Sequence, residues 1–168
     1  METPAKAYLG LGSNLGDRWT TLRMAREALD RETGISVCAR SGVYESMAAE
    51  GAVGQPAFLN AVLAVEIGLG PHELLRVCLR IEEQFGRIRR ARHGARTLDV
   101  DLLLYAEEQV KTPDLTVPHP RLAQRAFVLQ PLIDLLPSGR DPVSGMKFVD
   151  LLKRLPRAEL STLLEKDW

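Results

Sequence analysis

The chain has 168 residues, of which 45% are hydrophobic and 26% are charged, and its 22 basic residues balance 22 acidic ones. This length suits a single domain, 1–168, with a core large enough to fold without disulfides or a structural metal. A net charge of zero argues against bulk electrostatic capture of nucleic acid, so any charge chemistry must be local. The sequence lacks both a signal-peptide pattern and an apolar run long enough to span a bilayer, so we expect a cytoplasmic protein with no membrane partner.

The pattern of apolar residues predicts four strands and two helices in a simple order. Asp17 can cap the first helix, and the proline of Gly70-Pro71 suits the first turn of the second. The expected elements are a strand at 7–13, a helix at 17–34, strands at 35–44 and 58–69, a helix at 70–86 and a strand at 96–105. This order is typical of a ferredoxin-like α+β core, an antiparallel sheet with helices packed on it. Amphipathic segments at 126–136 and 148–164 predict C-terminal helical additions.

Three patterns invite functions that their spacing does not support. The glycines in 10–16 read G-x-G-x-x-x-G, which is not the dinucleotide-binding spacing, and the chain has no phosphate-loop motif. His72 precedes a glutamate as in zinc helices, but Arg76 stands where the second ligand would be, so we expect a surface histidine. Cys38 and Cys78 lack metal-type spacing, and we expect both to be free, buried thiols.

The segment at 96–105, RTLDVDLLLY, places two carboxylates inside an apolar strand. Because strand side chains alternate, Asp99 and Asp101 share one face. The opposite face is expected to carry Leu98, Val100, Leu102 and Leu104. Same-face neighbours lie roughly 7 Å apart, which suits two carboxylates that bind adjacent hard cations. A solvated strand face explains this pattern alone equally well, because Asp is depleted in strands but not excluded.

A dense cationic segment precedes this strand. Its arginines, with no acid among them, are Arg87, Arg89, Arg90, Arg92 and Arg96. Five like charges repel one another, whereas a polyphosphate offers guanidinium groups bidentate partners. Acids that hold Mg²⁺ beside arginines that hold phosphate favour phosphoryl transfer. His119, which lies between two prolines, is a further candidate phosphate ligand, although a lone loop histidine is more often incidental.

Four motifs in this order resemble those of the 6-hydroxymethyl-7,8-dihydropterin pyrophosphokinases, a family of folate biosynthesis. They are GLGSNLGDR at 10–18, QPAFLNAV at 55–62, HGARTLDVDLLLY at 93–105 and VPHPRLAQRAFVLQPL at 117–132. The resemblance covers nearly the whole chain and likewise implies a ferredoxin-like fold. It implies transfer of pyrophosphate from ATP to the hydroxymethyl group of the reduced pterin, which gives AMP and the pterin diphosphate.

The resemblance also implies roles for residues in these motifs and beside them. Asp99 and Asp101 would ligate two Mg²⁺ ions and form the catalytic set with Arg87 and Arg96. ATP would contact Arg87, Arg89, Arg96, Thr116, His119 and Arg125. The pterin would contact Ser46, Phe58, Asn60 and Phe127, with its ring between the two phenylalanines and its edge bonded to Asn60. Taken alone, either phenylalanine would more often be a core residue.

The same resemblance and the chain's length lead to expectations about motion and assembly. The loops at 47–56 and 87–96 are expected to close over bound substrates. We expect a monomer whose partners are two small molecules, ATP and the pterin, and not a nucleic acid.

Two rival functions predict different observations. A ferredoxin-like module that binds RNA through its sheet would carry stacking aromatics on the open face, where Asp99 and Asp101 are expected instead. A metal-dependent nucleotidyl transferase could use the same carboxylates, but it would release pyrophosphate rather than AMP. Identification of the nucleotide product therefore separates the two enzyme classes.

Overall fold

The computed structural model describes residues 3–47, 54–86 and 97–168. Its first half contains β1 (Ala5–Ser13), α1 (Arg18–Asp30), β2 (Ile35–Arg40), β3 (Val43–Ser46), β4 (Phe58–Ile67) and α2 (Pro71–Gln84). Its second half contains β5 (Asp99–Tyr105), β6 (Val110–Lys111), β7 (Thr116–Val117), η1 (Leu122–Gln124), α3 (Ala126–Leu135), α4 (Phe148–Lys153), η2 (Arg157–Glu159) and β8 (Thr162–Glu165).

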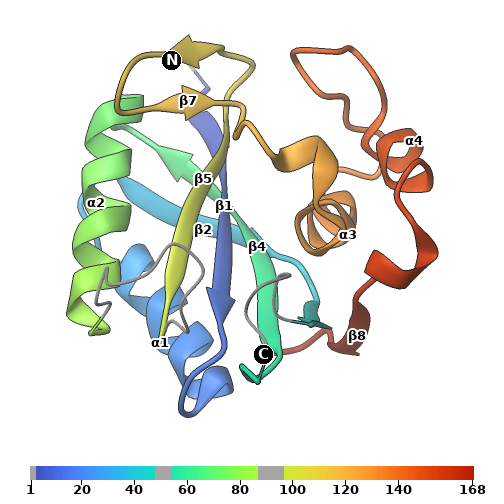
Figure 1. Ribbon diagram of the computed structural model, residues 1–168. Coiled ribbons are helices and arrows are strands. Elements are labelled where there is room, and N and C mark those ends of the chain that lie inside the picture. Colours follow the sequence, from blue (N-terminus) through green and yellow to red (C-terminus); the bar gives the residue numbers. More distant parts are fainter. Residues whose placement is uncertain (1–2, 48–53, 87–96) are drawn as a thin grey trace.

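The main sheet is antiparallel and has the strand order β5-β1-β4-β3-β8, with β2 also paired to β4. The strands β1 and β4 are neighbours at the centre of the sheet although they are far apart in the chain (Figure 1). The helices α1 and α2 pack on the same face of the sheet. β6 and β7 form a separate short ribbon. This arrangement confirms the predicted ferredoxin-like α+β fold.

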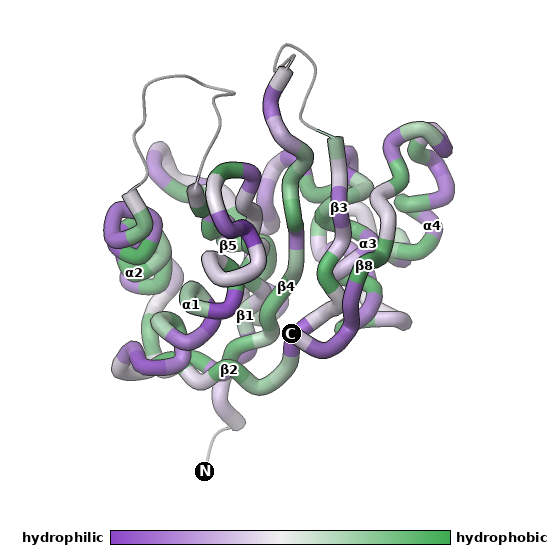
Figure 2. The backbone as a smooth tube through the Cα atoms, turned by 90° about the horizontal axis from the view of Figure 1, so that it is seen from below, coloured by the Kyte–Doolittle hydropathy of each residue, from purple (hydrophilic) through white to green (hydrophobic). Residues whose placement is uncertain are grey.

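Hydrophobic clusters cover both faces of the sheet. α1 and α2 pack on one face, and α3 and α4 pack on the other, with the apolar strand β4 between them (Figure 2). The largest fully buried side chains of the second cluster are Leu103, Leu122, Leu129 and Phe148. A β-carbon built on Gly10 of β1 would lie 3.4 Å from the Leu103 side chain. Because Gly10 pairs with Asp101, the acidic residues of β5 lie on the face that α3 covers.

β5 departs from strict alternation in its second half. The pairing register with β1 shifts within β5. Beyond the shift, Leu104 packs in the second cluster together with Leu103, whereas Leu102 packs in the first. The prediction that Leu104 shares a face with Leu102 was wrong, because a β-bulge changes the alternation beyond it. Asp99 and Asp101 precede the bulge and keep the predicted common face.

The segment predicted as one strand at 35–44 is two strands that follow each other along β4. Between them, the backbone N–H of Ser41 donates to the carbonyl of Val62 at 2.9 Å. The N–H of Val62 donates back to Ser41 Oγ at 2.8 Å. A hydroxyl thus replaces a strand carbonyl at the interruption, and these buried backbone groups stay paired.

The C-terminal additions are helical only in part. α3 forms where it was expected, but the segment at 148–164 is an α-helix only at 148–153. Pro156 follows shortly after, and proline cannot continue a helix because it lacks an N–H and restricts the preceding residue. The chain then ends in β8, an edge strand that pairs with β3.

Both cysteines are free, as predicted, but only Cys78 is buried. Cys38 is exposed because it lies where the register of β2 with β4 shifts, and a bulge turns its side chain away from the core. The prediction of two buried thiols was therefore wrong for Cys38.

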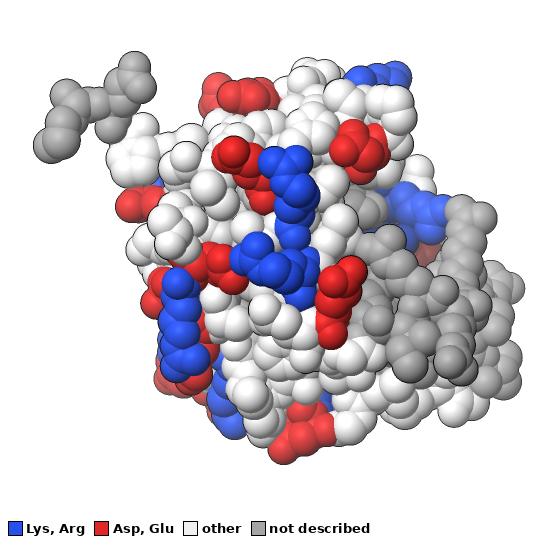
Figure 3. Space-filling view, turned by 90° about the vertical axis from the view of Figure 1, so that its left-hand side faces the viewer, with Lys and Arg blue, Asp and Glu red and all other residues white. Residues whose placement is uncertain are grey.

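Charges of both signs interleave on the face formed by α2 (Figure 3). One ion pair there joins Arg80 of α2 to Glu32, which follows α1. This mixture agrees with the zero net charge of the chain, and the described residues give this face no field of one sign. Among the helices of the described ranges, none has the length and apolar character needed to cross a membrane.

Candidate active site

Asp99 and Asp101 are half-buried at the start of β5, opposite two glycines of β1. Asp99 pairs with Gly12 and Asp101 pairs with Gly10. A β-carbon built on Gly12 would lie 3.9 Å from Cβ of Asp99 and 3.3 Å from Oδ1 of Asn60 on β4. Gly12 thus leaves a strip of bare backbone between the acid pair and Asn60, which we call the glycine strip.

Three of the predicted pterin contacts meet at this strip. Asn60 is only 6% exposed, and its Nδ2 donates to Ser46 Oγ at 2.7 Å. Ser46 is the cross-strand partner of Phe58. The Phe58 Cδ1 atom would lie 3.7 Å from a β-carbon on Gly12. Ser46, Phe58 and Asn60 therefore form one group, with Asn60 Oδ1 beside the strip as an acceptor for a ligand N–H.

The fourth predicted pterin contact, Phe127, lies in the first turn of α3. It is half-buried at the margin of the second hydrophobic cluster. The guanidinium carbon of Arg125, the N-cap of α3, lies 5.4 Å from the centre of the Phe127 ring. This cation–π contact joins a predicted ATP residue to a predicted pterin residue. The sandwich of a ring between Phe58 and Phe127 stays a prediction.

His119 is anchored to β5 just beyond the acid pair. Its backbone N–H donates to the carbonyl of Leu103 at 2.9 Å. The imidazole Nδ1 accepts from the backbone N–H of Arg121 at 3.2 Å. In the neutral ring the proton is therefore on Nε2, which makes Nε2 a hydrogen-bond donor. Thr116, the other predicted ATP contact in this segment, is exposed on β7.

The charges around His119 tie it to the same site. Burial lowers the pKa of the His119 imidazole below its ordinary value. Asp101 opposes this shift, and Arg125 and Arg121 reinforce it. His119 is thus within electrostatic range of one candidate metal ligand and one candidate phosphate ligand, and it is neutral at pH 7.

Two side chains that were not predicted as site residues connect the β1–α1 turn to the start of β4. Asn14 is 1% exposed, and its Nδ2 donates to the carbonyl of Pro56 at 3.3 Å. Arg18 Nη1 donates to the carbonyl of Ala57 at 2.7 Å and to Glu45 Oε2 at 3.0 Å. Both residues belong to the motif GLGSNLGDR at 10–18, and this position could have indicated a role for them.

A third missed residue is Glu82, which is 1% exposed on α2. Its Oε1 accepts a hydrogen bond from the backbone N–H of Val100 at 2.8 Å. Burial, followed by the charges of Glu82 and Asp101, raises the pKa of the Cys78 thiol to about 12. The available signal was an acidic residue within the apolar stripe of an amphipathic helix.

Several predicted site residues lie outside the described residues. These are Arg87, Arg89 and Arg96, together with most of the loop at 47–56 and the whole loop at 87–96. Within the described ranges, no three His, Cys, Asp or Glu side chains are gathered as a metal site. Metal binding by the acid pair stays a prediction.

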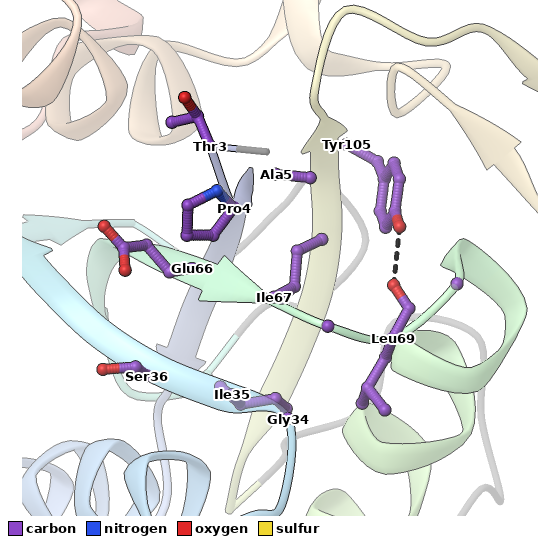
Figure 4. A pocket seen from close by; sticks show the side chains of 12 residues that line it. Thr3, Pro4, Ala5, Gly34, Ile35, Ser36, Glu66, Ile67, Leu69 and Tyr105 are labelled. Carbon is purple, nitrogen blue, oxygen red and sulfur yellow. Dashed lines mark hydrogen bonds between the residues drawn. The ribbon is translucent and has the colours of Figure 1, made fainter. Parts of the chain in front are cut away.

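A hollow at the other end of the sheet is a different place. Tyr105 ends the strand that Asp99 begins, and it borders this hollow with Glu66 and the chain start near Ala5 (Figure 4). The Tyr105 hydroxyl already donates to the carbonyl of Leu69. The hollow therefore contributes nothing to the candidate active site.

A ferredoxin-like sheet that presents paired carboxylates beside a neutral histidine and an arginine has the arrangement of a phosphoryl-group transferase. Comparison with known proteins narrows this class. Residues 8–137 match the family model described as 7,8-dihydro-6-hydroxymethylpterin-pyrophosphokinase. The chain belongs to this family, which confirms the resemblance found in the sequence.

Individual relatives agree with the family match. A 2-amino-4-hydroxy-6-hydroxymethyldihydropteridine pyrophosphokinase of Methylorubrum extorquens is 46% identical over 132 residues, which are 79% of this chain and 83% of that protein. The Bacillus subtilis protein of the same name is 43% identical over 129 residues, 77% of each chain. In Pisum sativum, a mitochondrial folate synthesis bifunctional protein is 41% identical over 136 residues, which are 81% of this chain but 26% of that one.

Solved structures support the fold. A crystal structure of Plasmodium falciparum HPPK-DHPS with pteroate has a TM-score of 0.71 at 14% identity. The match covers 92% of this chain and 43% of that one. An HPPK-DHPS in complex with substrates has a TM-score of 0.70 at 12% identity and covers 90% of this chain and 43% of that one. At these identities the likeness concerns the fold alone.

Proposed function

We propose that this protein transfers the pyrophosphoryl group of ATP to the hydroxymethyl group of 6-hydroxymethyl-7,8-dihydropterin, a step of folate biosynthesis, with Mg²⁺ held by Asp99 and Asp101. Family membership supports the reaction. The single observation that carries the metal site is the pair of half-buried carboxylates beside the glycine strip. Their hard oxygen donors fit Mg²⁺, which proteins usually bind through one or two carboxylates and substrate phosphates.

The chain's own residues would bind and orient ATP at one side of the acid pair. His119 would donate from Nε2 to a phosphate oxygen, because its Nδ1 is already used as an acceptor. Arg125 would add positive charge beside it, and Thr116, Arg87, Arg89 and Arg96 would complete the phosphate contacts. Two Mg²⁺ ions bound by the acid pair would neutralise phosphate charge and ease deprotonation of the attacking hydroxyl.

The pterin would lie at the other side of the glycine strip. Asn60 Oδ1 would accept a ring N–H, and Ser46 holds the Asn60 amide in the required direction. Phe58 and Phe127 would offer aromatic faces to the flat heterocycle. The hydroxymethyl group would cross Gly12 to reach the acid pair, because the strip carries no side chain there.

The nucleotide product tests this function. The protein is incubated with Mg-ATP and the hydroxymethyl dihydropterin, and the nucleotides are separated by chromatography. We expect AMP that forms only when the pterin and Mg²⁺ are both present. ADP would indicate transfer of a single phosphoryl group, and pyrophosphate would indicate a nucleotidyl transferase; either result would overturn the proposal.

We also propose that the protein acts as a cytoplasmic monomer whose partners are small molecules. Among the described residues, the charges on the α2 face are of both signs, which supports the expectation that nucleic acid is not a partner (Figure 3). Light scattering after gel filtration should give the mass of one chain. A mass of two chains at micromolar concentration would contradict the monomer.

A further inference from the structure

The Glu82 side chain contacts β5 between the two candidate metal ligands. Its Oε1 accepts from the N–H of Val100 at 2.8 Å. Val100 lies between Asp99 and Asp101 in the chain, so this carboxylate holds the peptide segment that joins them. The residue is 1% exposed, and water therefore does not compete for this hydrogen bond.

Among the strands of the described ranges, β5 stands at the edge of the sheet and pairs only with β1. In a strand, the backbone groups of successive residues point alternately to the two sides. The Val100 amide points to Glu82, so the amides of Asp99 and Asp101 face β1. β1 fixes the acidic segment from one side, and Glu82 fixes it from the side where an interior strand would have a second neighbour.

Packing alone does not explain an acid at this place. Glu82 lies in the buried stripe of α2, beside Cys78 and Ile81. Burial of a carboxylate costs several kcal/mol unless strong hydrogen bonds compensate. An apolar residue would fill the stripe without that cost, but it would leave the Val100 amide without its acceptor.

We propose that Glu82 is a positioning residue that sets the spacing and direction of the Asp99 and Asp101 carboxylates, and thereby the affinity of the acid pair for divalent cations. This inference rests on the proposed function, because it assumes that the acid pair is the cation site. Metal and catalytic sites require ligands held within about 0.5 Å of their working positions. An edge strand held from one side only would not maintain that precision.

Three variants separate the reach of the side chain from its charge. Glu82→Gln keeps an acceptor at the same reach and removes the charge. Glu82→Asp keeps the charge and withdraws the acceptor by one methylene. Glu82→Met keeps the approximate size and removes the acceptor. The matched control is Glu83→Gln, which removes a charge from the neighbouring exposed residue of α2.

The first readout is Mn²⁺ binding, measured by electron paramagnetic resonance in the presence of a non-hydrolysable ATP analogue. Loss of a group that orients metal ligands typically weakens metal binding about 10- to 100-fold. We expect that loss in Glu82→Asp and Glu82→Met, whereas Glu82→Gln and Glu83→Gln should bind within about threefold of the unaltered protein. The second readout is amide hydrogen exchange at Val100, which should accelerate in the Asp and Met variants only.

The relative Mn²⁺ affinities of the variants decide whether the proposal holds. If Glu82→Gln binds Mn²⁺ as weakly as Glu82→Asp, the residue acts through its charge and the positioning role is wrong. It is equally wrong if Glu82→Asp binds as tightly as the unaltered protein. Should Glu82→Met fail to fold, the Asp and Gln pair still decides. Absence of pterin-dependent AMP would overturn the proposed function, and the Mn²⁺ titrations would still test Glu82.

Discussion

The acid pair on β5 and the polar cluster around β3 use polar groups in opposite ways. Around β3, donors meet acceptors: the Tyr44 hydroxyl lies 2.9 Å and 3.0 Å from the two Asp134 oxygens, and the Gly42 N–H donates to Asp134 at 3.0 Å. The Trp168 indole N–H donates to the Ser41 carbonyl at 2.7 Å. At the acid pair, two carboxylates share one face of β5 opposite the glycines of β1. The β3 cluster stabilises the fold, whereas the proposed role of the acid pair is to bind a ligand.

The largest effect should come from the acid pair and should fall on activity. Asp101→Asn should lower turnover by about a thousandfold, or about 4 kcal/mol, because it removes a negatively charged cation ligand. The melting temperature should change little, because Asp101 is half-buried on a polar face and asparagine has nearly the same shape. AMP release and a thermal melt measure the two quantities.

The matched control for this variant is Asp114→Asn. Asp114 is an exposed carboxylate on the turn between β6 and β7, outside the strand that carries the acid pair. It should change turnover by less than twofold or so, as surface substitutions usually do. If Asp101→Asn kept turnover or lost its fold, the contrast between the two regions would fail.

For Trp168→Ala, we expect a loss of stability without a loss of activity. The side chain is buried, with 6% of the residue exposed, and Arg26 lies over its ring with 5.0 Å to the centroid. Truncation should lower the free energy of unfolding by about 3 kcal/mol, because it removes a buried aromatic and the bond to Ser41. Urea unfolding measures this loss, and turnover of the folded enzyme should be unchanged.

Leu164→Ala is the control for the truncation, since Leu164 is 43% exposed on β8. It should change stability by less than about 0.5 kcal/mol. Reduced turnover in folded Trp168→Ala would show that the C-terminal packing reaches the acid pair, and the two regions would then not be separable.

Asn60→Ala tests whether the site has a pterin side that is separate from its ATP side. Loss of the amide should raise the KM for the pterin about 10- to 30-fold, which corresponds to about 1.4–2 kcal/mol for a lost ligand hydrogen bond. The KM for ATP should not change, because Asn60 lies across the glycine strip from the acid pair. Steady-state kinetics with each substrate varied in turn measure both constants.

Ser46→Ala is the milder companion of this variant. It removes the acceptor of the Asn60 amide but leaves Oδ1 in place. The pterin KM should rise by only a few-fold. Equal effects on both substrates, in either variant, would contradict a separate pterin side of the strip.

The features that were predicted correctly depend on residues close together in the sequence. The common face of Asp99 and Asp101 follows from strand alternation, and the Asp17 cap, which accepts from the Thr20 N–H at 3.1 Å, follows from helix chemistry. The ferredoxin-like fold class followed from the order of elements, since few topologies satisfy short connections.

The parts that sequence reasoning missed depend on contacts between distant segments. The bulge that moves Leu104 to the other face arises in the pairing of β5 with β1. The pairing of β8 with β3 joins segments more than a hundred residues apart, and helical spacing at 148–164 gave no sign of it. Glu82 was missed for the same reason, because its partner Val100 lies on another element.

The smallest effect concerns Tyr44, which tests the β3 cluster by pH. Burial, and then the hydrogen bond to Asp134, raise the pKa of the Tyr44 phenol above its ordinary value. In the unfolded chain the phenol loses its proton near pH 10, whereas the folded protein retains it, so this stabilisation is present below about pH 10 and falls as the pH rises further. Tyr44→Phe should cost about 1 kcal/mol at pH 7, measured by urea unfolding, because one buried hydrogen bond is lost.

The difference between Tyr44→Phe and the unaltered protein should shrink as the pH is raised from 9 to about 11, since only the unaltered protein loses this contribution. Tyr8 and Tyr105, whose pKa values are also raised by burial, are present in both proteins and cancel in the comparison. A difference that stayed constant with pH would mean that Tyr44 ionises as readily in the fold as in the unfolded chain. The β3 cluster would then be as open to solvent as the acid pair, and the contrast between a stabilising region and a binding region would not hold.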